Sequence, residues 1–279
     1  MQTALITGST DGIGRETAKQ LAKRGYRIII HGRNQDKAER IKSELNEINP
    51  TLDHIIQLAD LNSQEELLNL SFRLEQNEEK IDVLINNAGI YKNKLEYSRE
   101  GIEKTAAVNY HSHFILTLLL LPLLNKTEEP RIINFSSMVH SHSLDPAEIW
   151  DPINFSGSQA YSDSKLAMIL FTFKLARNLD KAAVNCLHPG VINTKLLRRG
   201  WGAGGSSVEK GAKTPVYLAD SEQVKNKSGY YFVNKNKKKA ANAAYDHKLQ
   251  DQLWQESIDK IKYSEILNKI SEKFKSDLN

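Results

Sequence analysis

The sequence predicts an α/β fold: one doubly wound domain whose seven-stranded parallel sheet carries helices on both faces. Short apolar segments alternate along the chain with longer segments of helical periodicity, which is the pattern of successive βαβ units. The first apolar segment ends in a glycine-rich turn, Gly8–Gly14, that leads directly into a helical pattern. The chain has 279 residues, of which 40% are hydrophobic, enough for the core of one large domain.

Composition and charge exclude several classes of protein. The net charge of +4 is spread over the whole chain and does not indicate nucleic-acid binding. The single cysteine, Cys186, excludes an internal disulfide framework and suits a reducing compartment. No targeting segment precedes the first strand, so we expect a cytoplasmic protein. The paired histidines lie two residues apart, which is poor spacing for metal ligands on a helix, and no metal site is expected.

The most apolar stretch is Phe114–Leu124, which reads FILTLLLLPLL. It is too short to span a bilayer, so we expect no transmembrane anchor. Such a helix is expected in the core or at a subunit contact, which leaves a homodimer or a homotetramer open.

The glycine-rich turn is the first candidate binding site. It follows the apolar strand Ala4–Thr7, and a helix N-terminus after such a turn offers N–H donors to a pyrophosphate. Gly8 allows the tight turn, Gly12 lets the backbone approach the ligand, and Gly14 lets helix and strand pack. Asp11 would repel a phosphate, so we expect it to point away or to cap the helix. The residues assigned to a dinucleotide here are Gly8, Ser9, Thr10, Asp11, Gly12, Ile13 and Gly14.

The second strand, Tyr26–Ile30, is followed by Arg33 where an NAD-specific site would have a carboxylate. Guanidinium groups match the charge and geometry of a phosphate. We therefore assign Arg33 and Arg15 to the 2′-phosphate of NADP(H). Solvated surface arginines are the alternative, and it is stronger for Arg15.

Two further strand ends add candidates. After the third strand, His54–Leu58, Asp60 and Leu61 could contact the adenine; a helix N-cap is a compatible role for Asp60. The fourth strand, Ile81–Ile85, runs into Asn86-Asn87-Ala88-Gly89. Its amides can join strands, and its small residues let the backbone approach a ribose; the residues assigned are Asn87, Ala88 and Gly89.

The fifth strand, Arg131–Phe135, ends in Ser136-Ser137, whose hydroxyls could orient a substrate carbonyl. The helix Gln159–Leu179 then carries Tyr161 and Lys165, four residues apart and therefore on one face. A nearby ammonium favours the phenolate and is expected to lower the pKa of Tyr161. An amphipathic surface helix is the alternative for this pair taken alone.

After the sixth strand, Val184–Leu187, the turn at His188 leads to residues that can meet the nicotinamide. A Gly-rich segment, residues 195–208, is expected to form a mobile lid over an apolar substrate, with a disordered loop as the alternative. Gly229–Val233 is the seventh predicted strand, and Lys235–Lys239 a solvated loop. The nicotinamide candidates are Pro189, Gly190, Val191 and Thr194.

The motifs TGxxxGIG, NNAG and YxxxK together resemble the short-chain dehydrogenase/reductase family. The resemblance implies a Rossmann-type domain over residues 1–263, followed by a polar helical tail at 264–279. It also implies four catalytic residues, of which Asn109 holds a water that links to the active-site lysine. It favours Ser137 over Ser136. The catalytic set is Asn109, Ser137, Tyr161 and Lys165, and Tyr161 and Lys165 also contact the cofactor.

The long interval at 139–158, the His188-Pro189-Gly190-Val191 turn and the closing Leu253-Trp254 are similar to the retinol dehydrogenase-like branch. The family implies reversible hydride transfer between NADP(H) and a carbonyl or alcohol. A sensor or scaffold that binds NADP(H) without turnover is the main alternative, and a sugar-nucleotide epimerase or dehydratase is a weaker one. The substrate identity stays open, but bulky side chains indicate an apolar molecule. The residues assigned to it are Ser137, Trp150, Phe155, Leu196 and Trp201.

Overall fold

The strands form one sheet in the order β3-β2-β1-β4-β5-β6-β7-β8. The first seven are parallel, which confirms the predicted doubly wound α/β sheet. From β1 the chain adds β2 and β3 on one side of the sheet, and it then adds β4 and the later strands on the other side. Folds of this kind have a crevice at that switch point, at the carboxyl ends of β1 and β4. The computed structural model describes residues 1–277. The seven strands are β1 (Thr3–Ile6), β2 (Arg27–Gly32), β3 (Ile55–Leu58), β4 (Val83–Asn86), β5 (Arg131–Phe135), β6 (Ala183–His188) and β7 (Tyr230–Val233).

The sheet has an eighth strand that the sequence analysis missed. β8 (Asn236–Lys238) lies within the lysine run that was predicted to be a solvated loop, and it pairs antiparallel with β7. Asn234 and Lys235 have positive φ values of 49° and 65°, as a tight two-residue hairpin turn requires. The side chains of β8 are exposed, so its polar sequence carries no strand pattern.

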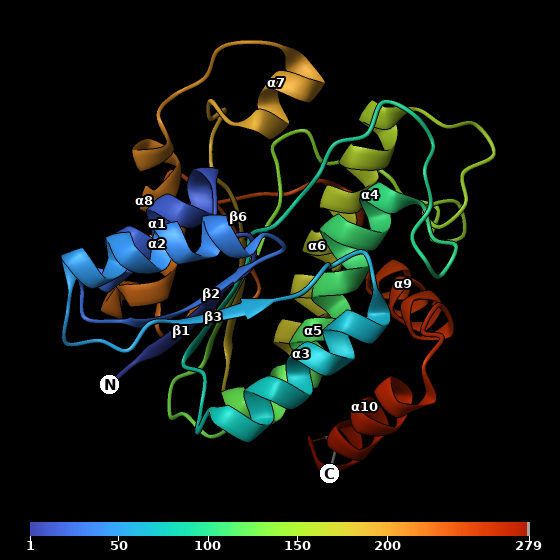
Figure 1. Cartoon of the computed structure of the whole chain (residues 1–279). Helices are drawn as coiled ribbons and strands as arrows, with labels where there is room; N and C mark the ends of the chain where they lie inside the picture. The colour runs from blue at the N-terminus through green and yellow to red at the C-terminus, as the bar shows by residue number, and fades with distance from the viewer. Residues whose placement is uncertain (278–279) are drawn as a thin grey trace.

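Helices cover both faces of the sheet (Figure 1). Alternate residues of a strand point to opposite faces, so Leu5 belongs to one core cluster while Ala4 and Ile6 belong to the other. One face is covered by α1 (Gly12–Ala22), α2 (Gln35–Ile48) and α8 (Val208–Asp220), and the other by α3 (Gln64–Asn77), α5 (Ser112–Leu124) and α6 (Gly157–Asn178).

The apolar helix α5 is buried on all sides. It continues a short helix, α4 (Lys104–Ala106), and a π-helical turn, η1 (Ala107–His111). Among the described residues, the run Lys104–Leu124 is the one helical segment long and apolar enough to cross a membrane, but 94% of its most apolar window is buried inside the fold. Its burial is that of a core helix.

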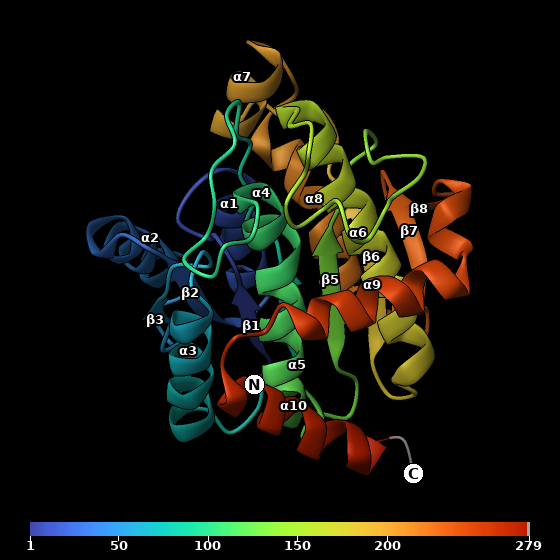
Figure 2. The same ribbon diagram turned by 90° about the vertical axis from the view of Figure 1, so that its right-hand side faces the viewer.

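The C-terminal helices α9 (His247–Asp259) and α10 (Ser264–Asp277) lie across α5 and α6 (Figure 2). Trp254 of α9 packs against Phe114 of α5, with ring centroids 5.0 Å apart. The predicted polar tail is therefore amphipathic: Ile266 and Ile270 of α10 are buried in the same core cluster as Phe114. Positions 278–279 of that tail lie outside the described residues. The remaining elements are α7 (Lys195–Trp201), η2 (Glu222–Val224) and η3 (Asn242–Tyr245).

Candidate active site

A cleft of about 910 Å³ lies at the carboxyl ends of the parallel strands. It is large enough for a dinucleotide together with a small molecule. The structure brings most of the predicted site residues together along its walls, although they come from segments far apart in the sequence. The predicted residues that line it are Gly8, Thr10, Asp11, Gly12, Ile13, Gly14, Arg15, Arg33, Asp60, Leu61, Asn87, Ala88, Gly89, Ser137, Tyr161, Lys165, Pro189, Gly190, Val191, Thr194, Leu196 and Trp201.

The glycine turn has the geometry of a phosphate cradle. A Cβ on Gly14 would lie 2.5 Å from the Gly8 carbonyl oxygen, so only glycine lets α1 begin this close to the turn. Gly12 has a φ of +56° and is the first residue of α1, whose N-terminal N–H groups lack helical partners. Asp11 caps α1 by accepting a hydrogen bond from the Gly12 N–H at 2.9 Å. The turn therefore fits the diphosphate of a nicotinamide dinucleotide.

Ser9 is the exception among the predicted turn residues, because it is buried and does not line the cleft. Its hydroxyl accepts a hydrogen bond from the His31 N–H at 2.9 Å, and its own N–H donates to the His31 carbonyl at 3.0 Å. Ser9 thus joins the turn to β2. The His31 ring adds a second tie by accepting from the Gly8 N–H at 3.2 Å, and the sequence analysis had missed His31.

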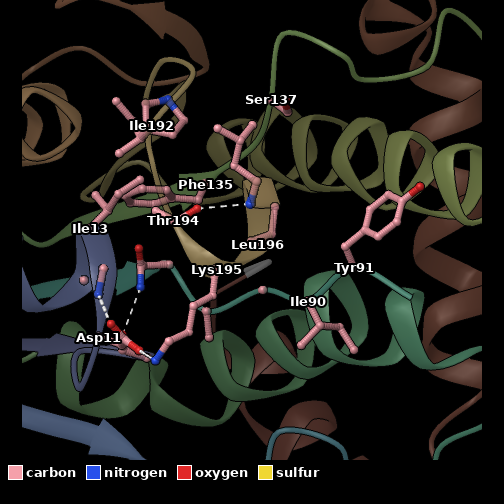
Figure 3. A pocket seen from close by; sticks show the side chains of 18 of the residues that line it. Asp11, Ile13, Ile90, Tyr91, Phe135, Ser137, Ile192, Thr194, Lys195 and Leu196 are labelled. Atoms are coloured by element: carbon pink, nitrogen blue, oxygen red, sulfur yellow. Dashed lines mark hydrogen bonds and ion pairs between the residues drawn. The ribbon is translucent and has the colours of Figure 1, made fainter. Parts of the chain in front are cut away.

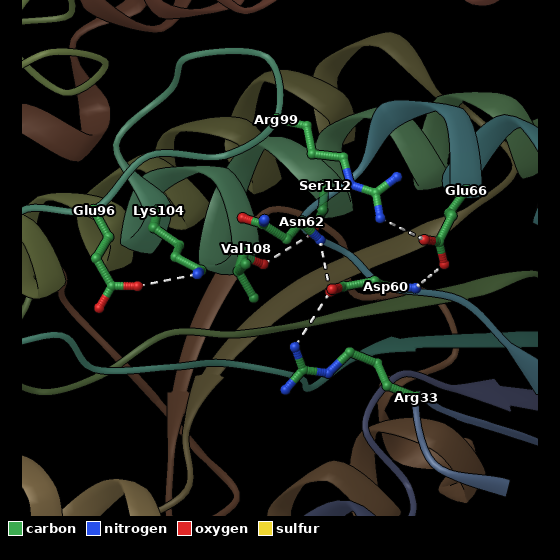
Figure 4. A network of polar contacts seen from close by, with 9 residues as sticks. All are labelled: Arg33, Asp60, Asn62, Glu66, Glu96, Arg99, Lys104, Val108 and Ser112. Atoms are coloured by element: carbon green, nitrogen blue, oxygen red, sulfur yellow. Dashed lines mark hydrogen bonds and ion pairs between the residues drawn. The ribbon is translucent and has the colours of Figure 1, made fainter.

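The two predicted phosphate ligands differ in their surroundings. Arg33 is 65% exposed at the cleft and lies 3.4 Å from Asp60, so it is free to reorient toward an anion (Figure 4). Arg15 instead forms a two-pronged ion pair with Glu44 of α2. Asp60 also accepts from the Asn62 N–H at 3.1 Å, while Ser63 takes the N-cap position of α3. The alternative N-cap role of Asp60 is therefore wrong, since Ser63 fills it.

The candidate catalytic side chains meet where β5 and α6 face each other. Lys165 is buried, and its Nζ donates to the Phe135 carbonyl at 3.1 Å and lies 5.5 Å from the centroid of the Tyr161 ring. The Ser136 hydroxyl donates to the Lys165 carbonyl at 2.7 Å and so holds α6 against β5. Ser137 is the hydroxyl that contacts the phenol of Tyr161, which favours Ser137 over Ser136.

Burial dominates the proton affinities of this pair. It raises the pKa of Tyr161 to about 12, although a hydrogen bond with Ser137 acts in the opposite direction. It lowers the pKa of Lys165 to about 8. Burial thus outweighs the Ser137 hydrogen bond and Lys165 does not lower the pKa of Tyr161, contrary to the expectation from helical spacing. The physical reason is that both groups lose hydration together, which disfavours the phenolate and the ammonium alike.

Asn109 does not line the cleft but lies directly behind it. It sits in the π-helical turn η1, where the family resemblance implied an interrupted helix. Its Oδ1 accepts from the Ile90 N–H at 2.7 Å, and its Nδ2 donates to the Ile90 carbonyl at 3.0 Å. A Cβ on Gly89 would lie 3.3 Å from Asn109 Oδ1 and 3.7 Å from Lys165 Nζ, so both side chains approach the backbone that follows β4.

The predicted lid is partly helical. Residues 193–206, which we call the strap, contain α7 and bridge the mouth of the cleft. Figure 3 shows Lys195, the first residue of α7, paired with Asp11 across the cleft. At the other end of α7, the Trp201 ring lies 5.1 Å from the Tyr91 ring and 5.2 Å from the Tyr161 ring. Tyr91 was missed by the sequence analysis, although only Ile90 separates it from the NNAG motif.

Two predicted substrate residues lie elsewhere. Trp150 is 1% exposed and packs in the core against Tyr110 and His111, with ring centroids 6.0 and 5.2 Å away. Phe155 is half-buried and does not line the cleft. A bulky side chain in an insertion can serve the core as well as a pocket, and the sequence does not distinguish the two. Met138 and Val139, exposed by 60% and 41%, line the cleft in their place.

Within residues 1–277, the structure contains no group of three or more His, Cys, Asp or Glu side chains arranged to hold a metal ion.

Known proteins resemble this chain in sequence and fold. The family model described as short chain dehydrogenase matches residues 2–201. The chain is 35% identical over 278 residues to retinol dehydrogenase 13 of Homo sapiens, covering 92% of this chain and 83% of that protein. It is 33% identical over 279 residues to the polyprenol dehydrogenase of Homo sapiens, covering 92% and 84%. A solved short-chain dehydrogenase from Escherichia coli CFT073, complexed with NADPH, has a TM-score of 0.71 at 25% identity and covers 84% of this chain and 97% of its own.

The chain therefore belongs to the short-chain dehydrogenase family, in its retinol dehydrogenase-like branch. Membership supports an oxidoreductase that acts on alcohols or carbonyls with a nicotinamide cofactor.

Proposed function

We propose that this protein transfers hydride reversibly between NADP(H) and an apolar carbonyl or alcohol substrate. One observation carries the proposal: Ser137, Tyr161 and Lys165 converge in the same cleft as a glycine turn built for a diphosphate. A protein that only bound the dinucleotide would have no need of a phenol and a hydroxyl in hydrogen-bond contact there.

NADP(H) is preferred over NAD(H) because of the residues after β2. Arg33 is exposed at the cleft, and the segment His31-Gly32-Arg33 offers no carboxylate for an unphosphorylated ribose. An exposed guanidinium that can leave Asp60 suits a 2′-phosphate. The NADPH complex of the Escherichia coli relative supports the same choice.

Ser137, Tyr161 and Lys165 each have a separate role in the proposed hydride transfer. A bound nicotinamide would supply the hydride in reduction and accept it in oxidation. Ser137 orients the carbonyl oxygen, and Tyr161 gives that oxygen a proton in reduction or removes one in oxidation. Lys165 adds a positive charge near the phenol and would hold the nicotinamide ribose.

We expect an apolar substrate because apolar side chains line the mouth of the cleft. Met138, Val139, Leu196, Trp201 and Tyr91 surround the entrance beside Tyr161. Two of the relatives are named for retinol and polyprenol, which are long apolar alcohols. A lipid-like or aromatic alcohol, aldehyde or ketone is the class proposed here.

A panel of aldehydes and ketones, screened for loss of NADPH absorbance with NADH in parallel, tests the proposal. We expect turnover with apolar carbonyls and a preference for NADPH. Binding of NADPH without turnover of any compound in either direction would favour the silent sensor instead. Faster turnover with NADH across the panel would contradict the role given to Arg33.

A further inference from the structure

The strap is anchored at its base by backbone hydrogen bonds, and its helix α7 is only partly covered by the rest of the protein. The Asn193 N–H donates to the Ser206 carbonyl at 2.9 Å, and the Ser206 N–H donates to the Val191 carbonyl at 2.8 Å. These bonds join the two ends of the strap to each other. Helix α7 lies between these two ends, and none of its residues is buried. Figure 1 shows α7 standing apart from the helices that cover the sheet. The strap is therefore held over the cleft by its few contacts with the opposite wall.

One of these contacts is an ion pair at the diphosphate end of the cleft. Lys195 Nζ lies 2.5 Å from Asp11 Oδ2. The start of the strap also comes close to the glycine turn, since a Cβ on Gly12 would lie 3.6 Å from Thr194 Cγ2. The second contact is the packing of Trp201 on Tyr91 and Tyr161, at the catalytic end.

Asp11 places a carboxylate at the start of α1, beside the expected diphosphate site. It caps α1, and a carboxylate at a helix N-terminus is favourable for the helix itself. The same N-terminus is where an anionic diphosphate would bind, and the carboxylate would repel it. Although burial acts in the opposite direction, the Lys195 ammonium and the Gly12 N–H hold the pKa of Asp11 below its usual range. Asp11 is therefore charged, and Lys195 is the cation beside it.

We propose that Lys195 is a cofactor-affinity residue: by neutralising Asp11 when the strap is closed, it makes the cleft suitable for a dinucleotide diphosphate. Strap closure and cofactor binding are then coupled, because opening the strap uncovers the Asp11 charge at the diphosphate site. The inference rests on the proposed cofactor function and adds a residue outside the family motifs.

A double-mutant cycle on NADPH binding tests the coupling. Asparagine caps helices as well as aspartate does, so Asp11→Asn removes the charge and keeps the cap. We expect Lys195→Met to raise the NADPH dissociation constant about three- to fivefold, because the pair with Asp11 is more than half exposed and partly screened by water. In the Asp11→Asn background the same change should raise the dissociation constant by less than about twofold, because no carboxylate is left to uncover. An equal loss in both backgrounds, or no loss in either, would overturn the inference.

Two controls separate this result from its alternatives. Lys210→Met removes an exposed positive charge from α8 and should leave the dissociation constant within about twofold. Trypsin cleavage at Arg198 and Arg199 of the strap, without cofactor, should be faster in Asp11→Asn than in the wild type. Equal cleavage rates would count against the ion pair as a strap anchor. A wild type that binds neither NADPH nor NADH would instead defeat the proposed function itself.

Discussion

Asn109 Nδ2 donates a hydrogen bond to Ser164 Oγ at 3.2 Å, which joins the π-helical turn η1 to the turn of α6 that carries Lys165. The same amide bonds both backbone groups of Ile90. One side chain thus links three segments behind the cleft. The π-helical turn is the local distortion that points this amide at its partners, as such turns often do at functional sites.

Removing that amide should be costly. Asn109→Ala leaves the Ile90 N–H and carbonyl without this partner, and each lost buried bond costs about 1–3 kcal/mol. We expect the free energy of unfolding, measured in urea, to fall by roughly 2–4 kcal/mol and turnover to fall with it. Ser112→Ala is the matched control, because the Ser112 hydroxyl bonds only one turn back, to Val108 at 2.9 Å. A similar loss in both variants would show that Asn109 has no special linking role.

Tyr161→Phe tests the acid/base assignment. The substitution keeps the ring that packs on Tyr91 and Trp201 but removes the proton that the substrate oxygen needs. We expect the NADPH dissociation constant to change by less than about twofold, while kcat falls by about two to four orders of magnitude. Steady-state kinetics and a binding titration measure both. Near-normal turnover would refute the role given to Tyr161.

Arg33→Ala tests the choice of cofactor. Loss of a charge-assisted phosphate contact should lower kcat/KM for NADPH by about 10- to 100-fold and leave the value for NADH nearly unchanged. Arg40→Ala, at an exposed position of α2, provides the control. Arg15→Ala should have the smaller effect, because Glu44 already engages that guanidinium. A parallel decrease with both cofactors would mean that Arg33 does not sense the 2′-phosphate.

Ile270→Asp tests whether α10 is part of the fold. Ile270 is buried in the core cluster that includes α5, so a carboxylate there should destabilise the protein by about 3 kcal/mol or more. Ser271→Asp places the same charge on the exposed side of the same helix and should change stability by less than about 0.5 kcal/mol. Urea unfolding compares the two. Equal stabilities would indicate that α10 packs too weakly to matter.

The buried histidines predict a loss of stability in mild acid. Burial lowers the pKa of His31 and His111 to about 4 and that of His113 to about 3, from 6.5 in the unfolded chain. Between those values the unfolded state binds more protons than the folded state, so the free energy of unfolding falls as pH drops below about 6.5. Each group adds a slope of up to about 1.4 kcal/mol per pH unit.

His111→Gln isolates one contribution to that slope. Its amide can still donate to the Ser257 carbonyl, which the His111 ring contacts at 2.8 Å, but it does not titrate. Urea unfolding between pH 7.5 and 5 should show a shallower decrease in this variant. A slope equal to that of the wild type would mean that His111 is not held neutral.

Local patterns in the sequence determined which segments form the parallel strands and which residues line most of the cleft. The glycine turn, NNAG and the Tyr161–Lys165 pair could be placed because each depends on turn chemistry or helical spacing within a few residues. Ser137 was chosen over Ser136 from the family resemblance. The seven parallel strands follow from the same alternation of segments. β8 escaped prediction because a tight turn, and not an apolar pattern, brings its polar residues to the sheet edge.

Only the tertiary structure decided which side chains meet across long distances. Trp150 joined the core rather than the cleft, and Lys195 met Asp11 from the opposite wall. The pKa of Tyr161 rose because burial outweighed its neighbours. Ion pairing, burial and proton affinity depend on every group packed around a residue, and those groups are brought together by the fold of the whole chain rather than by nearby sequence.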